Sequence, residues 1–299
     1  MHNLLYGLIA GLFYSLTRVP LTVAYRLGDR LGDLAYLLLS ERRRVVRDNL
    51  ALAFGEEKTA TERRAMARAA FRHIGRHLVD FGRLRGLTRE RYSQMCTIEG
   101  LDRLQALLAR QKGVLAVSAH FGSWELAPAM ALCLDTPLRV IVRPLDNPVL
   151  DRLVATYRRR GGYHTIPKRR AMAESLQALG RGEIVAVLMD QSSLRHQGIP
   201  VEFFGVKTYT SKGPALMALR AECPVIGVFL IRDTGGRHRL IFTPELPVRR
   251  TGNLSQDIED TTRLFNQMLE SYIRRYPDHW FWLHRRWKRR VMPAQQEGL

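Results

Sequence analysis

Six residues at 120–125, HFGSWE, have the types and spacing of a proton-transfer site. They follow the apolar run GVLAVSA at 113–119, which predicts a buried strand. A neutral imidazole can remove a proton from a hydroxyl near neutral pH, and a carboxylate that accepts from its other ring nitrogen stabilises the imidazolium. We therefore expect His120 to act as a general base at a strand end, with Glu125 as the carboxylate that orients it.

The segment around His120 does not supply an activated nucleophile. Ser123 lies outside a GxSxG elbow, and the nearest cysteine, Cys133, comes well after the motif. The activated hydroxyl is therefore expected to belong to the substrate, which implies direct transfer to an alcohol. A hydrolase that uses Ser118 or Ser123 is the enzymatic alternative, and a structural histidine with a helix-capping Glu125 is the non-catalytic one.

Helices that alternate with short apolar strands predict an α/β fold with a mostly parallel central sheet flanked by helices. We expect strands at 95–98, 113–119, 138–142, 184–189, 225–231 and 238–243, and helices at 59–85, 101–108, 123–134, 149–160, 170–180, 212–221 and 254–275. Ligand sites of such sheets lie at the carboxyl ends of the strands, where the sequence places His120, Arg143 and Asp190.

The N-terminus is apolar enough to contact a membrane. Residues 4–25 carry one charge, Arg18, and Pro20 follows it. We expect residues 1–40 to form N-terminal membrane-anchoring helices, either as a single tilted span or as helices in the interface, with a buried core helix as the alternative. The arginines that follow at 42–44 and 47 place the catalytic part on the cytoplasmic face by the positive-inside rule.

The remaining chain is long enough for one α/β core. We expect an amphipathic helical segment at 41–94, an α/β domain at 95–290 that includes a basic aromatic C-terminal helix, and a flexible tail at 291–299. The three cysteines lack metal-ligand spacing, so we expect no metal or other cofactor and a reducing compartment.

The chain has a net charge of +19, and only six of its 47 basic residues are lysine. Such a surface is expected to meet an anionic partner, and arginine suits phosphate and carboxylate groups. Tryptophans and arginines crowd residues 276–290, which is typical of a membrane headgroup surface but would also suit stacking on bases. A membrane-tethered nucleic-acid-binding protein is thus the non-enzymatic alternative, although no nucleic-acid-binding motif accompanies these residues.

Further motifs follow HFGSWE along the chain: RPLDNP at 143–148, IVAVLMDQ at 184–191, VEFFG at 201–205, TSKGPA at 210–215 and PDHWFWLHRRWK at 277–288. With this set the chain resembles, over essentially its whole length, the late acyltransferases of lipid A biosynthesis, the lauroyl and myristoyl transferases, within the lysophospholipid acyltransferase-like superfamily. The resemblance implies a glycerol-phosphate acyltransferase-like fold at the bacterial inner membrane. It also implies acyl transfer from acyl carrier protein, or from CoA, to a hydroxyl of a lipid A precursor. A lysophospholipid or phosphatidylinositol mannoside acceptor remains open.

The resemblance matches His120 and Glu125 to the family's catalytic histidine and acidic residue. Asp190 and Gln191 match its Asp-Gln pair, which implies a polar role within the site. Arg143 is expected either to stabilise an oxyanion or hold a phosphate, or to form a salt bridge with Asp146 or Asp190.

Phe203, Phe204 and Thr210 resemble the family's Phe-Phe-Gly segment and the threonine that follows it. We expect these residues to bind substrate, with the two rings as a wall of an acyl-chain groove. Ordinary core packing is the alternative for the two phenylalanines.

Overall fold

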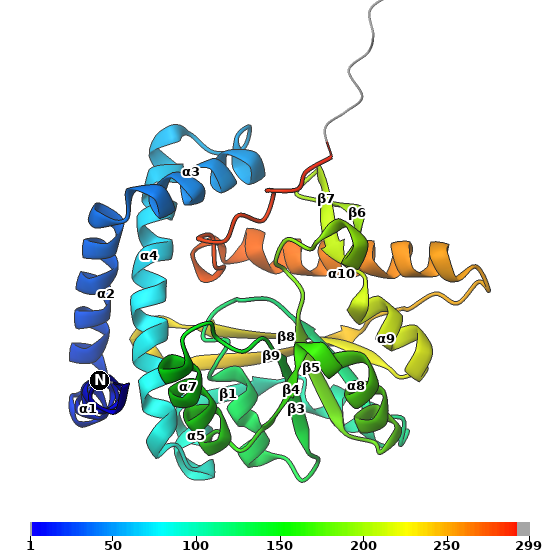
Figure 1. Ribbon diagram of the computed structural model, residues 1–299, viewed down its shortest axis with the longest axis horizontal. Coiled ribbons are helices and arrows are strands. Elements are labelled where there is room, and N and C mark those ends of the chain that lie inside the picture. Colours follow the sequence, from blue (N-terminus) through cyan, green and yellow to red (C-terminus); the bar gives the residue numbers. More distant parts are fainter. Residues whose placement is uncertain (1, 292–299) are drawn as a thin grey trace, which may run out of the picture.

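The computed structural model describes residues 2–291, and a seven-stranded sheet runs through it in the order β1-β9-β8-β2-β5-β3-β4 (Figure 1). The strands are β1 Cys96–Glu99, β2 Val114–Ser118, β3 Leu138–Val142, β4 His164–Pro167, β5 Ile184–Leu188, β8 Val225–Arg232 and β9 His238–Glu245. From β8 to β4 the strands are parallel, whereas β9 is antiparallel to β8 and pairs in parallel with β1. The expected α/β fold with a mostly parallel sheet is confirmed.

The helices are α1 His2–Arg18, α2 Leu21–Leu38, α3 Ser40–Phe54, α4 Ala60–Arg83, α5 Arg89–Met95, α6 Leu101–Leu108, α7 Pro148–Arg160, α8 Ala171–Gly180, α9 Gly213–Ala221 and α10 Leu254–Arg275. The prediction of a helix at 123–134 is wrong. Turns follow His120, and only Ala127–Cys133 is helical, as the 3₁₀ segment η2. Pro128 would stand inside the expected helix, where it lacks the N–H that an α-helix requires.

Both faces of the sheet are covered, because the side chains of each strand alternate between two cores. On β2, Leu115 and Val117 join a core with residues of α3, α4, α8, α9 and α10. Val114 and Ala116 point the other way, into a core with residues of α5, α6, α7 and η2. A strand that is buried on both sides has apolar residues at consecutive positions, and the sequences of β2 and β5 show this pattern.

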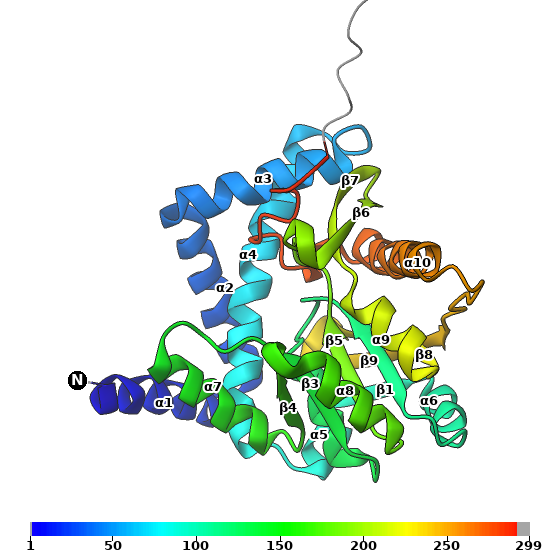
Figure 2. The same ribbon diagram turned by 45° about the vertical axis from the view of Figure 1, so that its right-hand side comes forward.

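The chain beyond α10 passes a separate hairpin, β6 Gly198–Phe203 with β7 Val206–Ser211 (Figure 2). Residues 280–290 form turns, so the expected basic aromatic C-terminal helix is wrong. Trp280, Trp282 and Trp287 are buried and pack against Phe203 and Phe204. The prediction that these tryptophans face lipid headgroups is also wrong, because their rings are buried in the core between the hairpin and the sheet. The expected flexible tail lies, beyond residue 291, outside the described residues.

Helix α2 lies against α4 along much of its length (Figure 1). Glycines allow this approach: a Cβ added to Gly75 would lie 1.9 Å from the carbonyl oxygen of Gly28. Two aspartates of α2 form ion pairs with arginines of α4, Asp29 with Arg76 at 2.6 Å and Asp33 with Arg68 and Arg72. The contact is therefore specific in both packing and charge.

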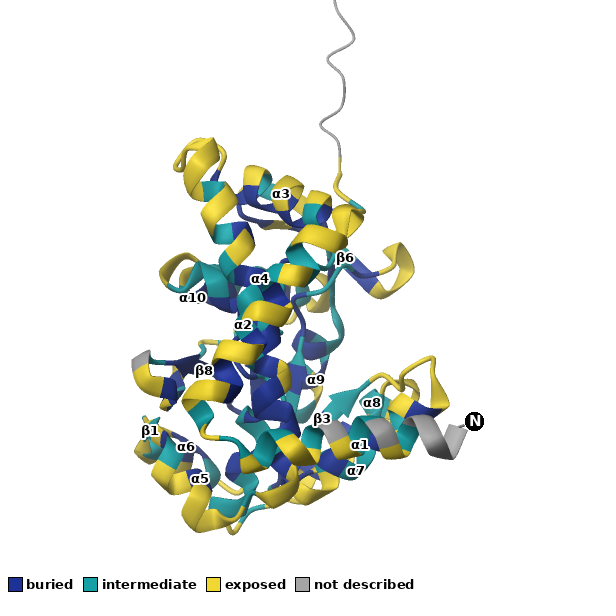
Figure 3. Cartoon of the chain, turned by 90° about the vertical axis from the view of Figure 1, so that its left-hand side faces the viewer, coloured by how far each residue is buried: buried dark blue, intermediate teal, exposed yellow. Residues whose placement is uncertain are grey.

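The outward side of α2 is exposed (Figure 3), and it carries an apolar stripe. Leu27, Leu31, Leu34 and Leu38 are all about half exposed or more and recur at helical spacing. Within residues 2–291, no helix combines the length and the apolar character that a bilayer span requires. The single tilted span is not supported, because Pro20 divides the apolar run between α1 and α2.

Candidate active site

The parallel strands β2 and β5 bring His120 and Asp190 together. Ser118 and Leu188 are partners in register, so the residues two positions further along each strand also lie opposite each other. Nδ1 of His120 is 2.9 Å from Oδ1 of Asp190. An ionised carboxylate only accepts hydrogen bonds, so in the neutral form of the ring Nδ1 carries the proton and Nε2 has the lone pair.

The Asp190 carboxylate is fixed on both oxygens. It is 2% exposed, and its Oδ2 accepts a hydrogen bond of 2.8 Å from Trp280 Nε1. Burial opposes protonation of the His120 ring, but the Asp190 carboxylate outweighs burial and raises the pKa of His120. Burial likewise opposes ionisation of Asp190, yet the His120 ring and the Trp280 N–H lower the pKa of that carboxyl. Both shifts favour the charged pair, which strengthens His120 as a base.

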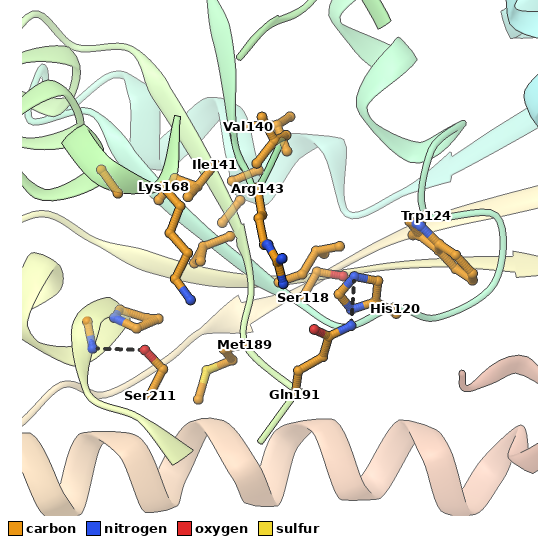
Figure 4. A pocket seen from close by; sticks show the side chains of 18 of the residues that line it. Ser118, His120, Trp124, Val140, Ile141, Arg143, Lys168, Met189, Gln191 and Ser211 are labelled. Atoms are coloured by element: carbon orange, nitrogen blue, oxygen red, sulfur yellow. Dashed lines mark hydrogen bonds between the residues drawn. The ribbon is translucent and has the colours of Figure 1, made fainter. Parts of the chain in front are cut away.

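The Nε2 side of His120 faces a cavity (Figure 4). The side-chain amide of Gln191 lies 3.4 Å from Nε2 and can donate to it. A second histidine on the cavity wall, His284, accepts a hydrogen bond from the Ser192 backbone N–H through its own Nε2, and burial lowers its pKa to about 4. Of these two histidines, His120 is therefore the one whose Nε2 faces the cavity without a backbone hydrogen bond.

Glu125 does not orient His120, so that expectation is wrong. Its carboxylate is bound on both oxygens by the Arg158 guanidinium, and the Tyr163 hydroxyl donates to it at 3.3 Å. Burial opposes ionisation of Glu125, but Arg158 outweighs burial and lowers the pKa. The chain forms turns, not a helix, after β2, and these turns direct Glu125 toward α7. Asp190 follows the neighbouring strand β5 and lies opposite His120.

Arg143 also lines the cavity, and its side chain points into it (Figure 4). Its partner is Asp146, at 2.8 Å, and both side chains are largely exposed to solvent. Of the two expected salt-bridge partners of Arg143, the contact is with Asp146, whereas Asp190 bonds to His120 and Trp280 instead. An exposed ion pair contributes little to stability, so a ligand can recruit the Arg143 guanidinium at small cost.

The cavity has a volume of about 1120 Å³ and extends from His120 along one face of the sheet. Two small side chains lie side by side on that face, since Ala116 of β2 and Ala186 of β5 are partners in register. Larger apolar side chains line the rest of this part, including Leu104, Met130, Val140, Leu230 and Phe242. The apolar part is suited to a hydrocarbon chain.

Phe203, Phe204 and Thr210 lie outside the cavity lining, so their expected contact with substrate is not supported. The two phenylalanines belong to the core, which was the alternative. Thr210 is fully buried and accepts a hydrogen bond from the guanidinium of Arg286. These residues hold the hairpin to the C-terminal segment that carries Trp280.

A buried polar cluster packs against the loop that carries His120. Asp80 of α4 accepts hydrogen bonds from Tyr25 of α2, Ser123 of the motif and Arg232 of β8. The side chains of Asp80 and Arg232 are 0% and 3% exposed. We call Tyr25, Asp80, Ser123 and Arg232 the Asp80 cluster. It ties the loop of His120 to three other elements of the fold.

Gly122 and Ser123 of the motif, and Ser118 of β2, also have structural roles. Gly122 has a φ of +59°, and a Cβ there would lie 1.6 Å from the carbonyl oxygen of Leu230. Ser123 is fully buried within the Asp80 cluster, and the Ser118 hydroxyl donates to the Val228 carbonyl. Neither hydroxyl is presented to His120 as a nucleophile would be, which disfavours the hydrolase alternative.

Within residues 2–291, one group could bring three metal-ligating side chains together: His73, Asp278 and His279. The side chains of this group already contact other groups of the protein. Nδ1 of His279 pairs with Asp278, its Nε2 accepts from the Arg232 backbone, and His73 Nδ1 lies 3.2 Å from the Arg232 guanidinium. The adjacent guanidinium makes this a poor cation site, and we assign it a structural role.

The sequence did not predict that several basic residues would line the cavity. Lys168, Arg169, Lys212 and Arg289 line the cavity from three separate segments. The arginine-rich runs were visible, but a charge run in the sequence does not tell which members face a cavity and which face solvent.

Comparison with known proteins gives consistent matches across the chain. Residues 2–289 match the family model described as bacterial lipid A biosynthesis acyltransferase. The lipid A biosynthesis palmitoleoyltransferase of Escherichia coli is 30% identical over 97% of this chain and 92% of its own. The lauroyltransferase of the same organism is 29% identical over 94% of this chain and 90% of its own. A phosphatidylinositol mannoside acyltransferase of Mycobacterium tuberculosis is 24% identical over 81% and 76%.

Proposed function

The chain belongs to the bacterial lipid A biosynthesis acyltransferases, and from that premise we propose that it transfers a fatty acyl group from a thioester to a hydroxyl of a lipid A precursor or related glycolipid. The observation that carries the proposal is the His120–Asp190 pair on the wall of a cavity with a long apolar part. A base beside such a cavity suits an O-acyltransferase whose two substrates meet at His120 Nε2.

In the proposed reaction, His120 Nε2 removes the proton of the acceptor hydroxyl while the oxygen attacks the thioester carbonyl carbon. The tetrahedral intermediate collapses with cleavage of the carbon–sulfur bond. The leaving thiolate takes the proton from the imidazolium, which leaves an ester, a free thiol and neutral His120. Asp190 stabilises the imidazolium, and Arg143 places positive charge where the oxyanion develops.

In this proposal Glu125 belongs to the site, but it shapes the cavity wall and does not orient His120. Glu125 and Arg158 both line the cavity, and their pair shapes its wall beside the base. The Glu125 charge also favours the protonated form of His120. Gln191 donates to Nε2 until the acceptor hydroxyl replaces it.

We propose acyl carrier protein as the donor, with CoA as the alternative, and the apolar part of the cavity as the site of the acyl chain. The net charge of +19 supports attraction of an acidic carrier. For the acceptor, the mycobacterial relative named a phosphatidylinositol mannoside acyltransferase keeps that glycolipid as the second candidate. A lysophospholipid is the third.

We propose that residues 1–40 hold the protein on the cytoplasmic face of the bacterial inner membrane as interfacial helices, followed by a helical segment at 41–94 and the catalytic domain at 95–290. The outward leucines of α2 support this, since their apolar stripe would otherwise face water. The arginines at 42–44 and 47 are placed to meet anionic headgroups.

The test is acyl transfer by the purified protein in detergent, followed by mass spectrometry of the lipid products. Wild type should acylate a lipid A precursor, and the His120→Ala variant should not. Transfer only to phosphatidylinositol mannoside or lysophospholipid would change the acceptor, and undiminished transfer by His120→Ala would overturn the mechanism.

A further inference from the structure

The lining of the cavity has more positive charge than its own carboxylates can neutralise. Among the described residues, six lysines and arginines line it, together with two carboxylates, Glu125 and Asp146. Both carboxylates are taken, by Arg158 and Arg143 respectively. Four cations are left over: Lys168, Arg169, Lys212 and Arg289.

These four cations come from distant parts of the chain. Lys168 and Arg169 follow β4, Lys212 follows β7, and Arg289 belongs to the C-terminal segment. Figure 4 shows Lys168 pointing into the same pocket as Arg143. Within residues 2–291 none of the four forms an ion pair with a carboxylate, whereas the neighbouring Arg170 pairs with Glu174.

Two of the unpaired cations, Lys212 and Arg289, are only partly exposed. No carboxylate among residues 2–291 pairs with these two side chains, so an anionic ligand can bind them without displacing a protein partner. The missing counter-charge is therefore expected to arrive with a ligand. Phosphate suits the site best, because it brings up to two negative charges and several acceptor oxygens to a site with both ammonium and guanidinium groups.

We propose that Lys168, Arg169, Lys212 and Arg289 form a phosphate-binding subsite of the cavity, which holds a phosphate group of a substrate while its reacting atom lies at His120. The inference rests on the proposed acyl transfer. Two sources share this chemistry: a phosphate on the glycolipid acceptor, and the phosphate of the pantetheine arm of the donor. In either case the subsite acts in binding and orientation rather than in proton transfer.

The experiment compares two double variants, Lys168→Met with Arg169→Met and Lys212→Met with Arg289→Met, against wild type. Matched controls are Arg170→Met and Arg290→Met, because these arginines adjoin the subsite in sequence but do not line the cavity. Thermal melting checks that every variant folds. Transfer by wild type establishes the acyltransferase reaction independently of what the variants do.

Each protein is assayed with a phosphorylated lipid A precursor and the same lipid after phosphatase treatment, and with acyl-CoA and the acyl thioester of N-acetylcysteamine, which has no phosphate. Loss of charged hydrogen bonds should raise the KM of the phosphate-bearing substrate about tenfold or more, with a smaller change in kcat. A rise for the phosphorylated acceptor alone assigns the acceptor's phosphate, and a rise for acyl-CoA alone assigns the donor's.

For the substrate without phosphate, the KM should be the same in wild type and in the variant. The conservative double variant Lys168→Arg with Lys212→Arg keeps the positive charge, so its KM values should stay within a few-fold of wild type. Unchanged KM values for both phosphate-bearing substrates would overturn the proposal. An equal rise with and without phosphate, or an equal rise in the controls, would also overturn it.

Discussion

His120 takes its carboxylate partner from Asp190, 70 residues away, at 2.9 Å, and not from the glutamate of its own motif. The pairing follows from the register of β2 and β5, whose carboxyl ends lie side by side. Because the partner comes from another strand, the sheet itself sets the geometry of the His120–Asp190 pair.

The Asp190→Asn variant should lose activity with a changed pH profile. Without the carboxylate the imidazolium is less stable, so kcat should fall by about a hundredfold to ten-thousandfold. In wild type the rate should decline as pH falls through the raised pKa of His120, because protonation removes the base. The variant should shift that acid limb to lower pH. An acid limb at the same pH in both proteins would contradict the pairing.

Glu125→Gln should affect stability as well as catalysis. The substitution leaves the Arg158 guanidinium without its charged partner in a partly buried site, which costs about 3–5 kcal/mol at most. We expect a lower melting temperature and a smaller loss of kcat than for Asp190→Asn. The double variant Glu125→Gln with Arg158→Met should recover part of the stability. A larger catalytic loss for Glu125→Gln than for Asp190→Asn, at equal stability, would give Glu125 the more direct role.

Ala186→Leu should shorten the acyl chain that the protein accepts. The added atoms enter the apolar part of the cavity beside Ala116, where the proposed chain would lie. Competition between donors of different chain length measures the change. We expect kcat/KM to fall for long chains and to stay near the wild-type value for the shortest chain used. An equal loss at every length would mean that this part of the cavity does not hold the chain.

Arg232→Met should destabilise the protein strongly. It leaves the Asp80 carboxylate buried without its cation, a change that costs about 3–5 kcal/mol. Burial opposes ionisation of Asp80, but Arg232 and His238 outweigh it, so the pKa lies well below its ordinary value. The stabilisation is therefore full above about pH 4 and is lost only as pH falls toward the lower folded-state value. Urea unfolding at several pH values measures it; equal stability in variant and wild type would show the pair to be neutral.

Replacing the outward leucines of α2 tests the membrane surface. Leu27, Leu31, Leu34 and Leu38 changed together to glutamine should reduce sedimentation with anionic vesicles while the melting temperature stays near wild type, because these side chains are exposed. Deletion of α2 is a poorer test, since Tyr25 belongs to the Asp80 cluster. Full vesicle binding by the fourfold variant would place the contact elsewhere.

The sequence predicted the sheet and most helices because their apolar periodicities are local signals. Strand β4 and the β6–β7 hairpin were missed, since His164–Pro167 is short, β6 contains a glycine and a proline, and β7 is largely polar. His120 was identified from its position after a strand, but its partner was assigned to Glu125 because distance along the chain does not report strand register. The aromatic C-terminus was misplaced for a related reason: composition suits a membrane surface and a buried core equally well.

The contact of α2 with α4 and the outward face of α2 are formed by different residues of the same helix. Gly28, Gly75 and the ion pairs of Asp29 and Asp33 fix how the helix lies on the rest of the molecule. The outward leucines take no part in that contact, so a substitution there changes the exposed face of α2 without altering how the helix lies against α4. The affinity of this face for a surface can therefore be changed by point mutation independently of the geometry around His120 and Asp190.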